Sequence, residues 1–380
     1  MISYGKHYID QDDIKSVSDS LKSKYITQGP NVSLFEEQIK KIFKAKGTVA
    51  VSSGTAALHL SGIALNWKPN DLVLTVPLTF IATANAVLYS GAKLGLVDID
   101  EKTLNIDLNL LEEKIKNLRK KRKKIKSIIA VDYAGNPCEW GEIKYLSKKY
   151  GFTVINDNCH AIGSKYKKSI GYAAKYADLV THSYHAVKNI TTGEGGSVLS
   201  LDKKKIEKIK DLRTHGLKYF NSSKSKLFYD MQSLGFNYRL TDFQSALGIS
   251  QLKKLNKFIH RRRQIAKIYD DAFQDNQKLI VPPVSTHSTH SYHLYPLQIK
   301  FDEIKISKKD LFIEMKKNNI ILQSHYLPIY RHSFYKKKFN YKDFPVSESF
   351  YKRQVSLPIY YSLKNTEVNK VIKLIKYFIK

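Results

Sequence analysis

One connection in the chain reads Ser183-Tyr184-His185-Ala186-Val187-Lys188-Asn189-Ile190-Thr191-Thr192-Gly193-Glu194-Gly195-Gly196. It lies between two apolar runs, Leu179–His182 and Ser197–Ser200, so we expect Lys188 on a polar turn at the end of a strand. The glycines after Lys188 let the backbone approach a bulky ring closely. A lysine amine has a pKa of about 10.4, and burial or cationic neighbours lower it until the amine attacks a carbonyl. Because a lone loop lysine is most often a solvated charge, these residues alone make Lys188 only a candidate nucleophile.

Short apolar runs alternate with helical patterns, such as Ala56–Leu65 and Leu110–Leu118, through the first two-thirds of the chain. Near-continuous apolar strands separated by helices predict an α/β sheet that is covered on both faces. Ligands in such sheets bind at the carboxyl ends of the strands. The expected strands are Thr48–Val51, Leu72–Val76, Leu94–Val97, Ile128–Asp132, Phe152–Asn156, Leu179–His182 and Ser197–Ser200.

The pattern changes at Asp242, where a helical stretch begins that reaches about Phe273. A smaller α+β unit follows the loop Val281-Pro282-Pro283. We therefore predict a large cofactor-binding domain over residues 1–245 and a smaller C-terminal domain over residues 246–380 that includes the long connecting helix. The elements expected in the smaller unit are a strand at Leu294–Ile299, a helix at Lys308–Lys317, a strand at Ile320–Gln323 and a final helix from about Glu367.

Composition excludes several classes of protein. The 380 residues contain two cysteines, Cys138 and Cys159, which excludes a disulfide scaffold and favours a reducing cytoplasm. The N-terminus lacks the apolar stretch of a secretory signal, and no run reaches the roughly 18 apolar residues of a spanning helix. We expect no membrane partner.

The net charge of +30 raises the possibility of nucleic-acid binding. The lysines are scattered along the whole chain, and the densest basic runs are Arg119–Lys124 and Arg261–Arg263. Neither a zinc-ligand cluster nor a basic motif interleaved with aromatics accompanies them. We interpret both runs as solvated faces and expect no nucleic-acid partner, although a basic surface also attracts a diphosphate-bearing substrate.

Two further strand ends carry polar residues. Asp157 ends the run Phe152–Asn156, where it is either a functional carboxylate or the N-cap of a following helix. Residues Val51–Leu58 read as strand, tight turn and helix start. A helix N-terminus preceded by Ser, Gly and Thr offers N–H groups and hydroxyls to an anion, but an ordinary Ser/Thr cap has the same pattern.

Together these segments resemble the DegT/DnrJ/EryC1/StrS family of sugar aminotransferases, which have the fold-type I architecture of pyridoxal-phosphate (PLP) enzymes. Matching segments extend from Thr27-Gln28-Gly29-Pro30 to Leu357-Pro358. The residues around Lys188 and the stretch Val131-Asp132-Tyr133-Ala134-Gly135 are similar to the aminotransferases of pseudaminic acid biosynthesis. Asn189 departs from that branch, which tends to have Pro there, and Asn158-Cys159 replaces the usual small pair.

The resemblance implies two catalytic residues, PLP as cofactor and no metal. Lys188 would hold PLP covalently and carry protons, and Asp157 would keep the pyridine nitrogen protonated, which makes the ring a better electron sink. The other implied cofactor contacts are Gly54, Thr55, Ala56 and Ser183 at the phosphate, Phe80 on the ring face and His160 beside the phenolic oxygen.

The resemblance also implies partners. Asn237 and Arg239 match a segment that reaches the PLP phosphate of a neighbouring subunit, so a homodimer with shared active sites is implied. Thr27, His325 and Tyr326 match residues that border the sugar.

The implied reaction transfers an amino group from L-glutamate to a UDP-linked 4-keto-6-deoxy-N-acetylhexosamine. Three alternatives stay open. The first is the same chemistry on a dTDP- or GDP-linked 3- or 4-keto-hexose. The second is a PLP-dependent sugar dehydratase, against which Lys188 argues because those relatives carry His in its place. The third is a non-catalytic or nucleic-acid-associated protein built on this fold.

Overall fold

The computed structural model describes residues 1–222 and 225–380. Its largest sheet has seven strands in the order β1-β8-β7-β5-β4-β2-β3, and within this sheet β8 alone runs antiparallel to its neighbours. The strands are β1 (Gly47–Val51), β2 (Leu72–Thr75), β3 (Lys93–Leu96), β4 (Ile125–Val131), β5 (Thr153–Asp157), β7 (Leu179–Ser183) and β8 (Gly196–Ser200). Each of the seven predicted strands is confirmed, with ends that differ by at most a few residues.

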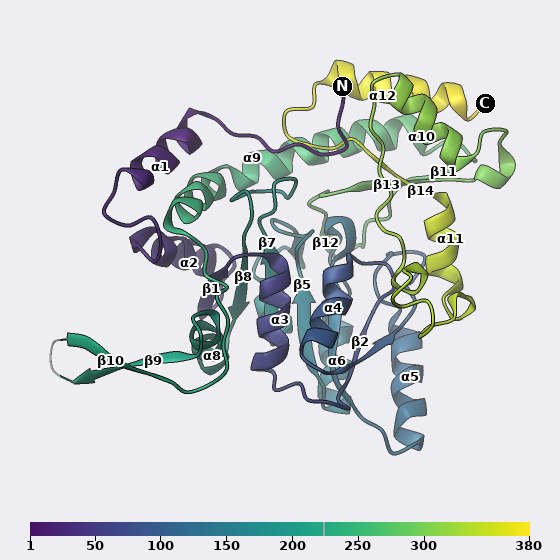
Figure 1. Ribbon diagram of the computed structural model, residues 1–380. Coiled ribbons are helices and arrows are strands. Elements are labelled where there is room, and N and C mark those ends of the chain that lie inside the picture. Colours follow the sequence, from purple (N-terminus) through teal and green to yellow (C-terminus); the bar gives the residue numbers. More distant parts are fainter. Residues whose placement is uncertain (223–224) are drawn as a thin grey trace.

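Helices cover both faces of this sheet, as the continuous apolar strands predict. Alternate strand residues enter two different cores: Val154 packs into one and its neighbour Ile155 into the other. Figure 1 shows α3 and α4 across one face. The helices of this part are α1 (Gln11–Leu21), α2 (Pro30–Ile42), α3 (Gly54–Ala64), α4 (Ile81–Tyr89), α5 (Leu108–Lys120), α6 (Trp140–Tyr150), α7 (Tyr172–Tyr176) and α8 (Lys203–Arg213).

Helix α9 (Asp242–Phe273) has the predicted bounds and joins two hydrophobic cores. Leu252, Leu255 and Phe258 pack into a core of the large sheet, whereas Tyr269 and Phe273 pack into the core of the C-terminal unit. The predicted domain boundary between residues 245 and 246 stays a prediction, because side chains of α9 pack into the cores of both parts of the chain.

The C-terminal unit packs a small sheet against helices. Its strands have the order β11-β13-β14. The elements are β11 (Leu279–Ile280), β13 (Tyr295–Ile299), α10 (Lys308–Lys317), α11 (Pro345–Arg353), β14 (Gln354–Leu357) and α12 (Asn365–Phe378). Two short strands, β6 (Lys165–Tyr166) and β12 (Ser288–Thr289), pair with each other and join the two parts of the chain.

Two sequence expectations are wrong. Residues Ile320–Gln323 form no strand, because Ile320 bridges to Ile2 and Gln323 to Ser356 as isolated pairs. Arg262 is 2% exposed and not part of a solvated face. Its Nη1 donates to the carbonyls of Tyr292, His293 and Ile359, because the helical period turns one of three consecutive arginines inward.

One feature was not anticipated from the sequence. The hairpin of β9 (Leu217–Ser222) and β10 (Ser225–Met231) projects from the body of the molecule (Figure 1). Among the described residues, no helix is long and apolar enough to span a membrane.

Candidate active site

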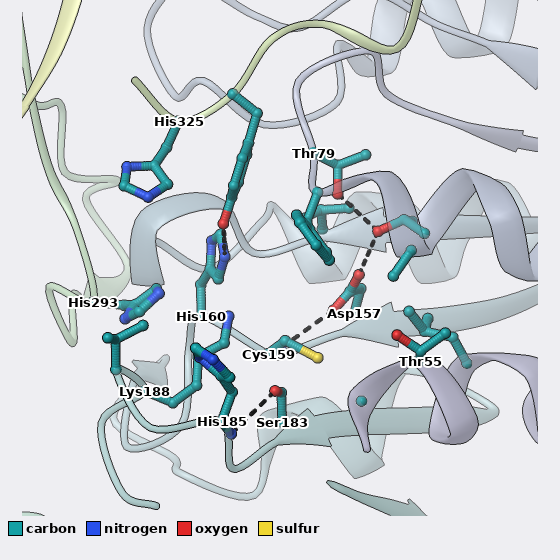
Figure 2. A pocket seen from close by; sticks show the side chains of 18 of the residues that line it. Thr55, Thr79, Asp157, Cys159, His160, Ser183, His185, Lys188, His293 and His325 are labelled. Atoms are coloured by element: carbon teal, nitrogen blue, oxygen red, sulfur yellow. Dashed lines mark hydrogen bonds between the residues drawn. The ribbon is translucent and has the colours of Figure 1, made fainter. Parts of the chain in front are cut away.

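A cavity of about 590 Å³ opens where strands β5 and β7 end. This volume lies in the range of small-ligand sites. Figure 2 shows Lys188, His160, His293 and His325 on one side of the cavity, opposite Asp157 and Thr55. The predicted site residues that line it are Gly54, Thr55, Phe80, Asp157, His160, Ser183, Lys188, His325 and Tyr326.

Lys188 lies on the turn that follows β7. Its backbone N–H donates to the carbonyl of His185, which closes the turn. Burial lowers the pKa of the Lys188 amine, while the nearby Cys159 and Asp157 oppose that shift. A buried amine of lowered pKa is a better nucleophile toward a carbonyl than an ordinary lysine.

Asp157 is the last residue of β5 and is 5% exposed. Its Oδ2 accepts from the hydroxyl of Thr83 at 2.7 Å, and its Oδ1 accepts from the N–H of Cys159 at 3.3 Å. The next regular element along this fully described stretch is β6, so Asp157 caps no helix and the cap interpretation is wrong. Both bonds aim the carboxylate at the end of its strand, where ligands of α/β sheets bind.

The start of α3 lines the cavity with Ser53, Gly54 and Thr55. Ser53 is the N-cap of α3, and its side chain accepts from the N–H of Ala56 at 3.0 Å. The first turn of a helix has N–H groups without intrahelical partners, so those of Gly54 and Thr55 are left for an anion. A Cβ at Gly54 would lie 2.9 Å from the Cβ of Ser183, which shows how closely α3 approaches β7.

Three buried imidazoles of the cavity feel the charge of Lys188. Burial, with a smaller contribution from the charge of Lys188, lowers the pKa of His160 and of His293 well below the usual range. Burial also lowers the pKa of His325 to about 3. All three rings are therefore neutral at pH 7 and add no positive charge to the cavity.

Four predicted residues do not line the cavity. Ala56 is buried inside α3, and its N–H is taken by the Ser53 cap. Thr27 is exposed and pairs with Thr241 through an isolated bridge. Asn237 is exposed and Arg239 is partly exposed, on the segment that connects the β9–β10 hairpin to α9.

Thr83 and His293 are among the residues of the cavity that sequence reasoning missed. Thr83 bonds both Thr79, at 2.8 Å between hydroxyls, and Asp157 (Figure 2). Thr83 follows Thr79 by four residues at a helix start, and this spacing could have predicted that the two side chains meet. His293 comes from just before β13, more than 100 positions after Lys188, and no local pattern distinguishes it from the nearby His287 and His290.

Comparison with known proteins identifies the family. The DegT/DnrJ/EryC1/StrS aminotransferase family matches residues 7–376. The chain belongs to this family. This member is therefore an aminotransferase, and the resemblance found in its sequence is confirmed.

Relatives match over nearly their full lengths. The UDP-4-amino-4,6-dideoxy-N-acetyl-beta-L-altrosamine transaminase of Campylobacter jejuni is 40% identical, across 98% of this chain and 96% of the relative. Helicobacter pylori PseC, an aminotransferase involved in the biosynthesis of pseudoaminic acid, has a TM-score of 0.90 at 33% identity and 99% coverage of both chains.

A second solved structure comes from a more distant relative. The PLP-form of the sugar aminotransferase Spr1654 from Streptococcus pneumoniae has a TM-score of 0.89 at 26% identity, over 99% of this chain and 97% of that one. The predicted fold class, a large mixed α/β sheet domain with a smaller C-terminal α+β part, is confirmed by these neighbours.

Proposed function

We propose that this aminotransferase binds PLP in the cavity and transfers an amino group from L-glutamate to a UDP-linked 4-keto-6-deoxy-N-acetylhexosamine. The observation that carries the proposal is that Lys188 and Asp157, predicted separately from two strand ends, line one cavity. Support for the sugar comes from the altrosamine transaminases, which are 34 to 41% identical to this chain over nearly its full length.

The residues present fit PLP. A planar phosphorylated pyridine needs an anion site, an acid partner for its nitrogen and an amine for its aldehyde. The α3 start with Ser183 supplies the first, Asp157 the second and Lys188 the third. Phe80 is 52% exposed at the cavity and leaves an aromatic face available for the ring.

In the proposed mechanism the bound cofactor supplies an electron sink for a negative charge at the reacting carbon. The side chains of the protein move and hold the protons. Lys188 Nζ carries the proton to and from that carbon, and Asp157 holds a proton at the ring nitrogen. Asp157 is held in turn by the Thr83 hydroxyl and the Cys159 N–H. The rings of His160, His293 and His325 are neutral and do not add positive charge beside Lys188.

We also propose a homodimer whose sites are shared. Asn237 and Arg239 lie outside the cavity of their own chain, on a segment that large exposed apolar side chains precede. Met231 is 60% exposed and Leu234 is 78% exposed, and these neighbouring apolar side chains support contact with another surface. A two-fold axis would bring this segment to the partner's cavity reciprocally.

We place the reaction in the cytoplasm, where the two free cysteines stay reduced.

Two measurements test the proposal. Borohydride should fix the cofactor to Lys188, and a peptide map would locate the label; label on another lysine, or protein that takes up no PLP, contradicts it. Incubation with L-glutamate and UDP-, dTDP- and GDP-linked keto-sugars, followed by NMR of the products, identifies the substrate. Turnover of a dTDP- or GDP-linked sugar with none of the UDP-linked sugar would contradict the substrate assignment alone.

A further inference from the structure

The turn Tyr133–Gly135 contacts the three segments that carry His160, His293 and His325. The Tyr133 hydroxyl donates to the carbonyl of His325, and the N–H of Leu294, which follows His293, donates to the carbonyl of Ala134. The N–H of Ala134 donates to Nδ1 of His160 at 3.3 Å. Ala134 adopts a φ of 57°, a left-handed conformation that is rare for residues other than glycine. The mechanism proposed above gives this turn no role.

The bond from Ala134 determines which nitrogen of His160 carries hydrogen. A backbone N–H can only donate, so Nδ1 of His160 must be an acceptor without hydrogen. A neutral imidazole has one N–H, which therefore lies on Nε2. The pKa of His160 is lowered well below the usual range by burial, which agrees with a ring that does not gain a second hydrogen.

The direction of the next hydrogen bond follows. Nε2 of His160 lies 2.8 Å from the hydroxyl oxygen of Tyr326. With its hydrogen on Nε2, His160 donates this bond and cannot accept from the phenol. Burial raises the pKa of Tyr326 well above its usual value, so the phenol keeps its hydrogen. That hydrogen is left for another acceptor, and Tyr326 lines the cavity.

We propose that Tyr326 donates its hydroxyl hydrogen to an acceptor oxygen of a ligand in this cavity, and that His160 is a positioning residue that sets this direction. The proposal rests on the function above, because the acceptor is either the phenolic oxygen of the cofactor or an oxygen of the keto-sugar. His160, whose one N–H is used by Tyr326, acts on the ligand through that tyrosine.

Neutron diffraction from deuterium-exchanged crystals of the wild-type protein tests the direction itself. Deuterium is expected on Nε2 of His160 and not on Nδ1, with the deuterium of Tyr326 directed away from His160. Deuterium on Nδ1, or a Tyr326 deuterium aimed at His160, overturns the proposal. The measurement needs neither sugar nor turnover, so its result stands even if the substrate assignment fails.

A double-mutant cycle tests the action through Tyr326. Tyr326→Phe removes the donor, His160→Leu removes the residue that orients it, and His160→Gln keeps an N–H near Nε2. Two readouts are taken: the pH midpoint of the bound cofactor's absorbance without sugar, and KM for the UDP-linked 4-keto-sugar. A lost hydrogen bond corresponds to roughly a 10-fold change in either one.

We expect the effects of the His160 and Tyr326 substitutions to be coupled, because both remove the same hydrogen bond to the ligand. His160→Leu should change the same readout as Tyr326→Phe, add nothing further in the double variant, and be partly rescued by His160→Gln. A raised absorbance midpoint assigns the acceptor to the cofactor, whereas a raised KM with an unchanged midpoint assigns it to the sugar. Additive effects, or a Tyr326→Phe variant that changes neither readout, overturn the proposal.

Discussion

The hydroxyl of Thr83 on α4 donates to Oδ2 of Asp157 at the end of β5, across 2.7 Å. This bond joins a helix start to a strand end, and Thr79 extends it by a further 2.8 Å contact between hydroxyls. The orientation of the Asp157 carboxylate, which we propose holds the cofactor's ring nitrogen, is therefore set by two threonines at the start of α4.

We expect Asp157→Asn to bind PLP and lose turnover by orders of magnitude, because the electron sink needs its acid partner. Thr83→Val removes only the donor to Asp157 and should cost roughly 10-fold in kcat, as for one lost buried hydrogen bond. Steady-state kinetics check both variants. Thr103→Val is the control, because Thr103 makes a similar 2.9 Å bond to Asp100 outside the cavity. Near-normal turnover of Asp157→Asn would contradict the assigned role.

In cofactor-free protein, the Lys188 amine should react with acylating reagents at lower pH than ordinary lysines. Burial lowers its pKa, so the neutral nucleophilic amine appears earlier as pH rises. Lys149 is an internal comparison, since its bond to Glu112 raises its pKa. Competitive labelling followed by mass spectrometry, over a pH series, measures both lysines in one sample. A Lys188 midpoint at or above those of the exposed lysines in the same sample would be incompatible with this site.

Gly54→Ala should weaken PLP binding and destabilise the fold. The new Cβ would lie 2.9 Å from the Cβ of Ser183, so α3 must move away from β7; such overpacking costs about 1–3 kcal/mol. Thermal unfolding and PLP titration measure the two effects. Gly141→Ala is a matched control in helix α6, where the nearest atom to the new Cβ lies at 3.4 Å. Equal melting temperatures and equal PLP affinities of the two variants would argue against a tight turn that binds the phosphate.

Subunit mixing tests the shared site. Lys188→Ala protein and Asn237→Ala, Arg239→Ala protein should each have little activity. If sites are shared, a heterodimer places both lesions in one site and leaves the other intact, so exchange of subunits should restore activity. If each chain builds its own site, mixing restores nothing. A fully active monomer in sedimentation would also end the dimer proposal.

Salt should raise KM for the nucleotide-sugar and leave kcat nearly unchanged. A chain with a net charge of +30 attracts an anionic diphosphate, and ions screen that attraction. Kinetics at several salt concentrations measure it. A KM that does not respond to salt would show that the excess of lysine has no part in substrate capture.

Local patterns predicted those parts of the fold that depend on neighbours in sequence. The seven strands and the bounds of α9 and α10 follow from runs and periods of apolar residues, because burial on a strand or helix face repeats along the chain. The roles of Lys188 and Asp157 came from family resemblance, and the cavity that joins them agrees with it.

Contacts between distant segments were not predictable. His160 and Tyr326 are 166 positions apart, and their bond depends on how the C-terminal unit docks. Arg262 is buried because three backbone carbonyls from two loops meet it, a fact that no pattern near residue 262 records. The strand expected at Ile320–Gln323 failed for the same reason, since its two ends pair with different distant segments.

The continuity of α9 limits how the enzyme can close around a substrate. A rigid-body rotation of the C-terminal unit would have to bend an unbroken helix of 32 residues whose two halves are packed in different cores. The loops that carry Phe80 and Tyr326 line the cavity and can move to admit the sugar without bending this helix.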